Sequence, residues 1–268
     1  MSVQTLYTAA TGMSAMETRL DVIANNLANV ETTAFKRDRA HFEDLFYRHE
    51  KMPGTQDSAG NMTPTGIAVG LGSKVTSTQS DMEQGAFHIT DNPLDVAIVG
   101  KGFFQITEPS DGTLRYTRAG NFSQNANGDI VMSSANIGRL LEPSISIPED
   151  ATEVSIGADG NIAVRQPGNE TMSIIGQIEL AYFPNPQGLL KIGENLYEET
   201  DASGAPVTGT PGEEGLGKLQ QGALEASNVQ PVEELIGLIT TQRAFELNSK
   251  AVQVGDEMMQ IVANLKRF

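Results

Sequence analysis

Apolar residues recur at alternating steps of three and four along the first part of the chain. The series is Leu6, Ala9, Met13, Met16, Leu20, Ile23, Leu27 and Val30. A heptad spacing of this kind places apolar side chains along one side of a helix. The pattern predicts one helix through residues 1–30 that ends at Thr32 and Thr33, because β-branched side chains weaken a helix.

The last part of the chain carries two such series, offset from each other. One runs through Leu235, Leu238, Gln242, Phe245, Ser249, Val252, Asp256, Met259 and Ala263, and the other through Leu247, Ala251, Val254, Met258, Ile261 and Leu265. A helix with two apolar sides needs more than one neighbour, since a lone pair of helices would leave one side in water. The helix is predicted to begin near Pro231, with Asn228 or Gln230 as its cap and with Glu233 and Glu234 at its positive end.

Between the two helices the pattern changes to short β-rich runs. The predicted strands are Lys74–Thr78, Leu94–Val99, Phe103–Thr107, Leu114–Thr117, Ile130–Met132, Ile145–Ile147, Val154–Ile156, Ile162–Val164 and Ile174–Phe183. The turn signals between them are Asp111-Gly112, Asn127-Gly128, Asp159-Gly160 and Asn185-Pro186. Many short strands at close spacing predict an antiparallel sandwich or barrel rather than βαβ units. Residues 49–66 and 200–217 are rich in polar residues, Gly and Pro, and are expected to be flexible or extended.

The expected fold class is therefore α+β. The N- and C-terminal helices are predicted to pair as a coiled-coil-like hairpin, beside a β-rich antiparallel central domain and extended connecting segments. We expect a terminal helical assembly domain from residues 1–35 and 228–268, a connecting domain from 36–92 and 192–227 with an extended insert near 45–66, and a β-rich outer domain from 93–191.

Charge is distributed unevenly over the 268 residues. The net charge is −16, yet residues 1–51 and 232–268 are each nearly neutral, so the middle of the chain carries almost all of it. Nucleic acid and anionic membranes bind basic surfaces, which argues against both as partners. Aromatic residues make up only 6 % and Trp is absent, which predicts a mostly aliphatic core. No apolar run approaches the roughly 18 to 20 residues of a membrane span.

Cysteine is absent, which excludes disulfides, thiolate metal sites and cysteine nucleophiles. The N-terminal residues lack the basic start and the unbroken apolar run of a secretory signal peptide. Any export is therefore expected to proceed without a cleaved signal.

No group of residues has the pattern of an active site. The three histidines, His41, His49 and His88, lack partners at metal-ligand spacing, and the first two are expected on an exposed connecting segment. The nucleophile motif of serine hydrolases is missing as well. We expect no catalytic residue, no cofactor and no metal.

Two glycine-containing stretches look like ligand loops but lack the required groups. Gly212 to Leu219 has the spacing of a phosphate loop, yet Leu219 stands where a hydroxyl must hold magnesium, and Glu213-Glu214 would repel phosphate. Asp159-Gly160-Asn161 lacks later calcium ligands, so a hairpin turn is expected there.

Five stretches occur in the order known from one protein family. They are NNLANVETTAFKR (Asn25–Arg37), LDVAIVGKGFF (Leu94–Phe104), YTRAGNF (Tyr116–Phe122), GENLYEETDASGAP (Gly193–Pro206) and SNVQPVEELIGLITTQRAFELNSK (Ser227–Lys250). Together they resemble the bacterial flagellar basal-body rod and hook protein family, over nearly the whole chain. Length and central motifs are most similar to distal-rod members, and a proximal rod subunit is the alternative. Residues 45–66 correspond in place to an insert that stiffens the distal rod relative to the hook.

The resemblance implies a structural, non-enzymatic subunit of the flagellar distal rod. Such subunits polymerise into a hollow helical tube in the periplasm that transmits motor torque to the hook. The implied partners are other copies of the chain, proximal rod proteins, the hook protein, the surrounding periplasmic and outer-membrane ring proteins and the flagellar export apparatus. Two interpretations from other classes are a secreted glycan hydrolase, which needs two carboxylates about 5 to 9.5 Å apart, and a monomeric adaptor with a helical hairpin.

The candidate residues for packing between subunits lie in the two terminal helices. They are Leu6, Met13, Leu20, Ile23, Asn25, Asn26, Leu27, Asn29, Leu235, Leu238, Phe245, Val252 and Met259. For each apolar candidate residue two roles are possible: contact between copies or packing within one chain. The asparagines either bond between subunits or only end the first helix. Gly102, Phe103 and Phe104 are expected in the β core.

Overall fold

The described residues of a computed structural model are 3–56, 61–62, 64–134, 137–168, 171–213 and 215–265, without the side chains of residues 3 and 265. Contacts divide the chain into two compact units. Unit 1 consists of Met1–Ala28, Asp38–Ser80 and Gln230–Phe268, and unit 2 of Asn29–Arg37 and Asp81–Val229. The predicted α+β class is confirmed, whereas the division into three domains remains a prediction.

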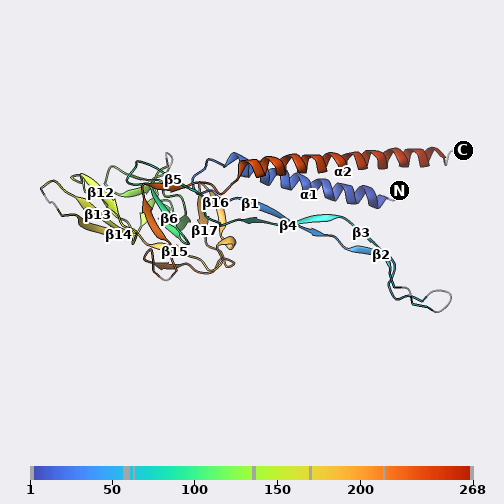
Figure 1. Ribbon diagram of the computed structural model, residues 1–268, viewed down its shortest axis with the longest axis horizontal. Coiled ribbons are helices and arrows are strands. Elements are labelled where there is room, and N and C mark those ends of the chain that lie inside the picture. The colour runs from blue at the N-terminus through green and yellow to red at the C-terminus, as the bar shows by residue number, and fades with distance from the viewer. Residues whose placement is uncertain are drawn as a thin grey trace. The chain divides into compact units, whose positions relative to one another are not determined.

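Two helices form the larger part of unit 1. Helix α1 spans Val3–Ala28 and helix α2 spans Pro231–Leu265. The two lie side by side with both termini of the chain at the same end of the pair (Figure 1). Glu233 and Glu234 occupy the first turn of α2 as predicted. Helix α1 ends before the predicted stop at Thr32, because residues 29–33 form turns instead.

The remainder of unit 1 is a two-stranded antiparallel ribbon. Strand β1 (Asp38–Asp44) pairs with β4 (Ser73–Ser80), and β2 (Tyr47–Lys51) pairs with β3 (Ile67–Gly70). Leu45 and Leu71 donate their N–H groups to the carbonyls of Gly72 and Phe46, which joins the two ladders into one arm. The described part of residues 49–66 therefore lies in and beyond an extended hairpin. His41 and His49 are exposed as predicted, but they lie on β1 and β2 rather than in a connecting loop.

Unit 2 is built from antiparallel strands. Its largest sheet has the order β16-β17-β8-β7-β11-β10-β9, with β15 on β7 and β18 on β15. These strands are β7 (Phe103–Thr107), β8 (Leu114–Thr117), β9 (Phe122–Gln124), β10 (Ile130–Met132), β11 (Leu140–Glu142), β15 (Leu180–Tyr182), β16 (Leu190–Gly193), β17 (Leu196–Glu198) and β18 (Val207–Gly209). A 3-10 helix, η1, covers Pro186–Gly188.

Smaller sheets complete unit 2. They are the three-stranded sheet of β12 (Glu153–Ile156), β13 (Asn161–Arg165) and β14 (Ser173–Gln177), the pair of β6 (Val96–Val99) with β19 (Lys218–Gln221), and the pair of β5 (Phe87–Ile89) with β20 (Ala223–Glu225). Gly112, Gly128 and Gly160 have positive φ in turns between strands, which confirms three of the predicted turn signals.

Three hydrophobic clusters form the core of unit 2. The largest is mostly aliphatic, as predicted, with Phe104 and Phe122 in edge-to-face contact at its centre. A second cluster is aromatic, since Phe103 packs edge-on against both Phe183 and Tyr197. Phe103 and Phe104 are therefore core residues as expected, in two different clusters.

Some strand predictions are wrong. Residues 145–147 form only an isolated bridge, in which Ser146 pairs with Asp129, and backbone hydrogen bonds join them to Gly128 and Ile130 over that short length alone. The run Ile174–Phe183 is divided between β14 and β15, which belong to different sheets. A continuous apolar run does not reveal such a division, since both sides of the break are buried.

Candidate assembly site

The sequence positions suspected of ligand chemistry serve the fold. Among the described residues, no group of three or more His, Cys, Asp or Glu is arranged to hold a metal ion. The N–H of Gly212 donates to the carbonyl of Gly217, and the N–H of Gly217 donates to the backbone carbonyl of Lys101. The carboxylate of Glu213 accepts a hydrogen bond from the Thr210 hydroxyl at 2.7 Å. These backbone donors are used within the chain and do not form a phosphate cradle; residue 214 lies outside the described residues.

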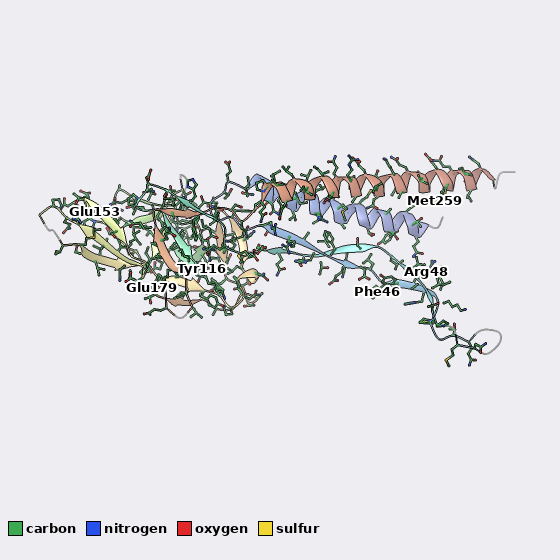
Figure 2. All side chains as sticks on the ribbon, in the orientation of Figure 1. Phe46, Arg48, Tyr116, Glu153, Glu179 and Met259 are labelled. Carbon is green, nitrogen blue, oxygen red and sulfur yellow. The ribbon has the colours of Figure 1, made fainter. Side chains whose placement is uncertain are left out.

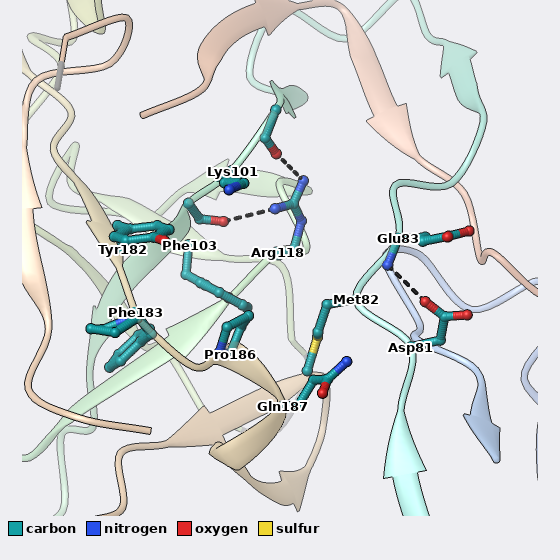
Figure 3. A pocket seen from close by; sticks show the side chains of 13 residues that line it. Asp81, Met82, Glu83, Lys101, Phe103, Arg118, Tyr182, Phe183, Pro186 and Gln187 are labelled. Atoms are coloured by element: carbon teal, nitrogen blue, oxygen red, sulfur yellow. Dashed lines mark hydrogen bonds between the residues drawn. The ribbon is translucent and has the colours of Figure 1, made fainter. Parts of the chain in front are cut away.

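One pocket of 420 Å³ opens in unit 2 (Figure 3). Asp81 and Glu83 lie together on one side of it, and the rings of Tyr182 and Phe183 lie on the other. The Asp81 carboxylate accepts the Glu83 N–H at 3.1 Å, so the two acids belong to one local turn. This is not the arrangement of two carboxylates across a groove that a glycan hydrolase requires.

The helix pair of unit 1 is the strongest candidate for assembly. Gly255 of α2 lies so close to Leu6 of α1 that a Cβ atom at position 255 would be 2.6 Å from Leu6 Cδ2. Near the other end, a Cβ at Gly237 would lie 3.4 Å from Ile23 Cδ1. The contact moves from Leu6 to Ile23 along α1 while it moves from Gly255 back to Gly237 along α2, so the helices are antiparallel. Glycine permits this close approach because it has no side chain to separate the two backbones.

The side of α2 that is covered differs in part from the predicted series. Its buried or half-buried positions are Glu234, Gly237, Leu238, Thr241, Ala244, Phe245, Asn248, Ser249, Val252, Gly255 and Met259. Five of these belong to the predicted series, but Leu235, Gln242, Asp256 and Ala263 of that series are exposed. Small residues occupy the alternate positions instead, and they let α1 approach closely. Close packing of α1 and α2 is established, while the coiled-coil geometry remains a prediction.

A second side of α2 is apolar and uncovered. We call it the outer stripe; its residues are Val232, Ile236, Ile239, Leu247, Val254, Met258 and Ile261. All are exposed, and Leu247 is 67 % exposed. The helical period places them on one side, roughly opposite α1. The helix is about 50 Å long at 1.5 Å per residue. An apolar surface of this length on a helix indicates an interface.

The other candidate residues occupy three kinds of position. In α1, Ile23 is buried, and Leu6, Met13, Leu20 and Leu27 are half-buried. Leu235 of α2 is exposed, whereas Met259 lies on the covered side near the C-terminal end (Figure 2).

Asn26 serves the fold of its own chain. Its amide Nδ2 donates to the carbonyl of Asp38 and its Oδ1 accepts the Asp38 N–H, both at 2.9 Å. These two hydrogen bonds fix the first residue of β1 to the last turn of α1. Asn25 is exposed, and Asn29 accepts a hydrogen bond from the Thr32 hydroxyl at 3.1 Å in the turn that follows α1.

Unit 2 contains a buried cluster of charges that the sequence patterns did not reveal. Lys36 and Glu225 have fully buried side chains and pair at 2.5 Å, and Arg118 pairs with the other Glu225 oxygen at 3.0 Å. The N–H of Gly85 also donates to Glu225. Lys36 and Glu225 are 189 residues apart in the sequence, so no local pattern could have indicated their pairing.

The cluster predicts a loss of stability in acid. Burial alone raises the pKa of Glu225, but Arg118, Lys36 and the hydrogen bonds outweigh it and hold the pKa below its ordinary value of 4.5. Such a carboxylate stabilises the fold above its unfolded pKa, and this contribution is lost as the pH falls through the folded pKa. The free energy of unfolding, measured with denaturant, should fall below about pH 5. Glu225→Gln should show a smaller loss over the same range; an equal loss would assign the effect to other carboxylates.

The comparisons with known proteins cover the whole chain. The models described as Flagella basal body rod protein, Flagellar hook protein FlgE/F/G D1 domain and Flagellar basal body rod FlgEFG protein C-terminal match residues 6–36, 97–164 and 220–265. Flagellar basal-body rod protein FlgG of Caulobacter vibrioides is 47 % identical over 265 residues, which is 98 % of this chain and 100 % of that protein. This chain belongs to the FlgG family of flagellar basal-body rod proteins.

More distant relatives support the same family. FlgG of Borreliella burgdorferi is 44 % identical over 99 % of each chain. FlgG of Bacillus subtilis is 38 % identical over 99 % of this chain and 100 % of that protein. The flagellar hook-basal body complex protein FlhP of the same bacterium is only 25 % identical, so full-length similarity is greater to the FlgG proteins.

The three rod and hook family models match distinct parts of the structure. The first covers α1 and the segment to Lys36, the second covers β6 to β13, and the third covers the end of β19, β20 and α2. As a member of this family the chain is a structural component of the flagellar basal-body rod. Within the described residues, neither helix has a stretch that is apolar enough to cross a membrane.

Proposed function

We propose that the protein is a subunit of the distal rod that polymerises with other copies into a hollow helical tube and transmits motor torque to the hook. The observation that carries this proposal is the outer stripe of α2. It leaves seven apolar side chains exposed on one side of α2, interrupted there by Arg243 and Lys250, while the opposite side of the helix already packs on α1. Only another protein surface removes such a stripe from water.

A second copy of the chain is the occupant that charge favours. The segments that contain the two helices are nearly neutral, while most of the net charge of −16 lies between them. Copies that meet through their helices therefore bring little charge together, and the acidic middle parts remain in water. Contacts that repeat from copy to copy without closing into a ring produce a filament.

The candidate packing residues enter this proposal with separate roles. Leu235 is exposed and would contact neighbouring copies, whereas Phe245, Val252 and Met259 support the helix pair, and Asn25 lies at an exposed position of α1. The ribbon arm adds a further surface, since Phe46, which lies between β1 and β2, is 88 % exposed (Figure 2). We assign the arm, including the described part of residues 45–66, to contacts that stiffen the rod.

The proposal extends to location and partners. The rod would lie in the periplasm, reached through the flagellar export apparatus without a cleaved signal. Its subunits would meet proximal rod proteins, the hook protein and the periplasmic and outer-membrane ring proteins. The function is structural and involves no enzymatic step.

Quantitative mass spectrometry of purified hook–basal bodies tests the proposal. We expect this chain to be more abundant than the proximal rod subunits and less abundant than the hook protein. Equal abundance with the proximal subunits would identify it as one of them. Absence from the particles would refute the rod function and favour an adaptor or an enzyme.

A further inference from the structure

The chain passes between its two units at four places. These are the peptide bonds after Ala28, Arg37, Ser80 and Val229. On the side of unit 2 they lead into three stretches, residues 29–37, 81–86 and 223–229, which we call the crossing segments. Any force that the backbone carries from one unit to the other must pass through them.

One side chain connects all three crossing segments. Asn228 Oδ1 accepts the N–H of Arg37 at 2.7 Å, and Asn228 Nδ2 donates to the carbonyls of Asp81 at 2.8 Å and Glu83 at 3.1 Å. Its backbone N–H donates to the carbonyl of Phe35 at 3.3 Å. Sequence analysis considered Asn228 only as a helix cap, but Pro231 begins α2 and the Asn228 amide is used entirely in this junction.

Direct bonds between crossing segments 29–37 and 81–86 reinforce this junction. The N–H of Asp81 donates to the carbonyl of Arg37 at 2.8 Å, and the Arg37 guanidinium lies 3.7 Å from the Asp81 carboxylate. Residues 35–37, 81–83 and 228 thus form one closed set of hydrogen bonds within unit 2.

The buried charges anchor these segments to the sheets of unit 2. Lys36 donates to Glu83 O at 2.6 Å and pairs with Glu225, so it connects all three crossing segments a second time. Arg118 extends the connection because it donates to the carbonyls of Gly100 and Gly102, at the ends of β6 and β7 (Figure 3).

We propose that Asn228 is a torque-coupling residue, which clamps the crossing segments so that they carry load between the two units as one body. This inference rests on the proposed rod function. Three segments loaded together share a force that would otherwise extend one strand at a time. The role is one of positioning, and it requires no contact with another copy.

Asn228→Asp tests the proposal with little change in size. It keeps an acceptor for the Arg37 N–H but sets a carboxylate oxygen against the carbonyls of Asp81 and Glu83. In the purified full chain we expect amide hydrogen exchange in residues 35–37 and 81–86 to be about tenfold faster. In cells with this variant as their only copy, we expect normal incorporation into basal bodies, normal rotation at low load, and loss of rotation or broken rods at high viscous load.

The matched control is Asn185→Asp, since Asn185 Nδ2 also donates to a carbonyl of unit 2, that of Ala202 at 3.0 Å, but joins no crossing segment. Flagella of cells with Asn185→Asp as their only copy should rotate normally at high load. If Asn228→Asp does not fold, Asn228→Ala removes the same bonds without adding a charge and takes its place.

The remaining outcomes separate the inference from the rod function. Unchanged exchange, or faster exchange with normal rotation at high load, would overturn the coupling role. So would failure of the variant to enter basal bodies while its exchange is normal, because Asn228 would then act between copies. Absence of the unaltered chain from basal bodies would overturn the rod function and the torque role together, while the exchange data would still decide whether Asn228 clamps the segments.

Discussion

Replacing Glu225 with Ala is expected to lower the free energy of unfolding by about 3 to 5 kcal/mol. Its carboxylate is the shared counter-charge of Lys36 and Arg118, at 2.5 and 3.0 Å. Removal leaves two cations in the interior of unit 2 without an anion, and it also removes the acceptor for the N–H of Gly85. The cost is mainly that of the unpaired charges rather than of one lost bond.

Equilibrium unfolding of the full chain in denaturant measures this change. The near-ultraviolet circular dichroism of tyrosine is a suitable signal, because Tyr116, Tyr182 and Tyr197 all lie in unit 2. The control is Glu153→Ala, which removes a half-exposed pair with Arg165 at 3.1 Å and should cost no more than about 1 kcal/mol. Equal effects of the two variants would show that the buried cluster has no special importance.

Leu247→Asp is expected to abolish incorporation into the rod while leaving the monomer folded. Leu247 is 67 % exposed at the centre of the outer stripe, so the carboxylate remains in water in the free chain. In a filament the same carboxylate would have to be buried against apolar side chains, which costs far more than a lost contact. The free energy of unfolding should change by about 0.5 kcal/mol or less.

The controls for Leu247→Asp lie on the same helix. Gln253→Asp adds the same charge at an exposed polar position outside the stripe and should assemble. Phe245 lies on the covered side of α2, so Phe245→Asp should weaken the helix pair as well as assembly. The measurements are motility and the amount of each variant in purified basal bodies. Normal incorporation of Leu247→Asp would refute the stripe as an interface.

The terminal helices could be predicted from sequence because their information is local. Leu238, Phe245, Val252 and Met259 repeat every seven residues, and the structure places all four on the covered side of α2. Of the alternate positions, Ser249 is half-buried as predicted, whereas Gln242 and Asp256 are exposed. Thr241, Asn248 and Gly255 were missed, since a search for apolar residues does not register them. Close helix packing selects such small residues, and only the partner helix shows where they are needed.

Sequence patterns located some strands and missed others, among them β1, β2 and β3. Strands β7, β8 and β10 were located at their observed bounds because their residues have strong β preference and clear turn signals. Strands β1 and β2 are polar and exposed, so their extended form depends on hydrogen bonds to β4 and β3. A ladder between distant segments has no signature in either segment alone.

By itself, the sequence determined the family, the α+β class, the two helices and their apolar sides, because heptads, turns and ordered motifs are properties of neighbouring residues. The tertiary structure alone decided which apolar stripe of α2 remains uncovered and how the crossing segments are joined. Lys36, Arg118 and Asn228 lie in the family motifs, but the motifs do not show which residues they contact, and Glu225 lies outside them. Their roles come from contacts between residues far apart in sequence, which exist only when folding has excluded water around them.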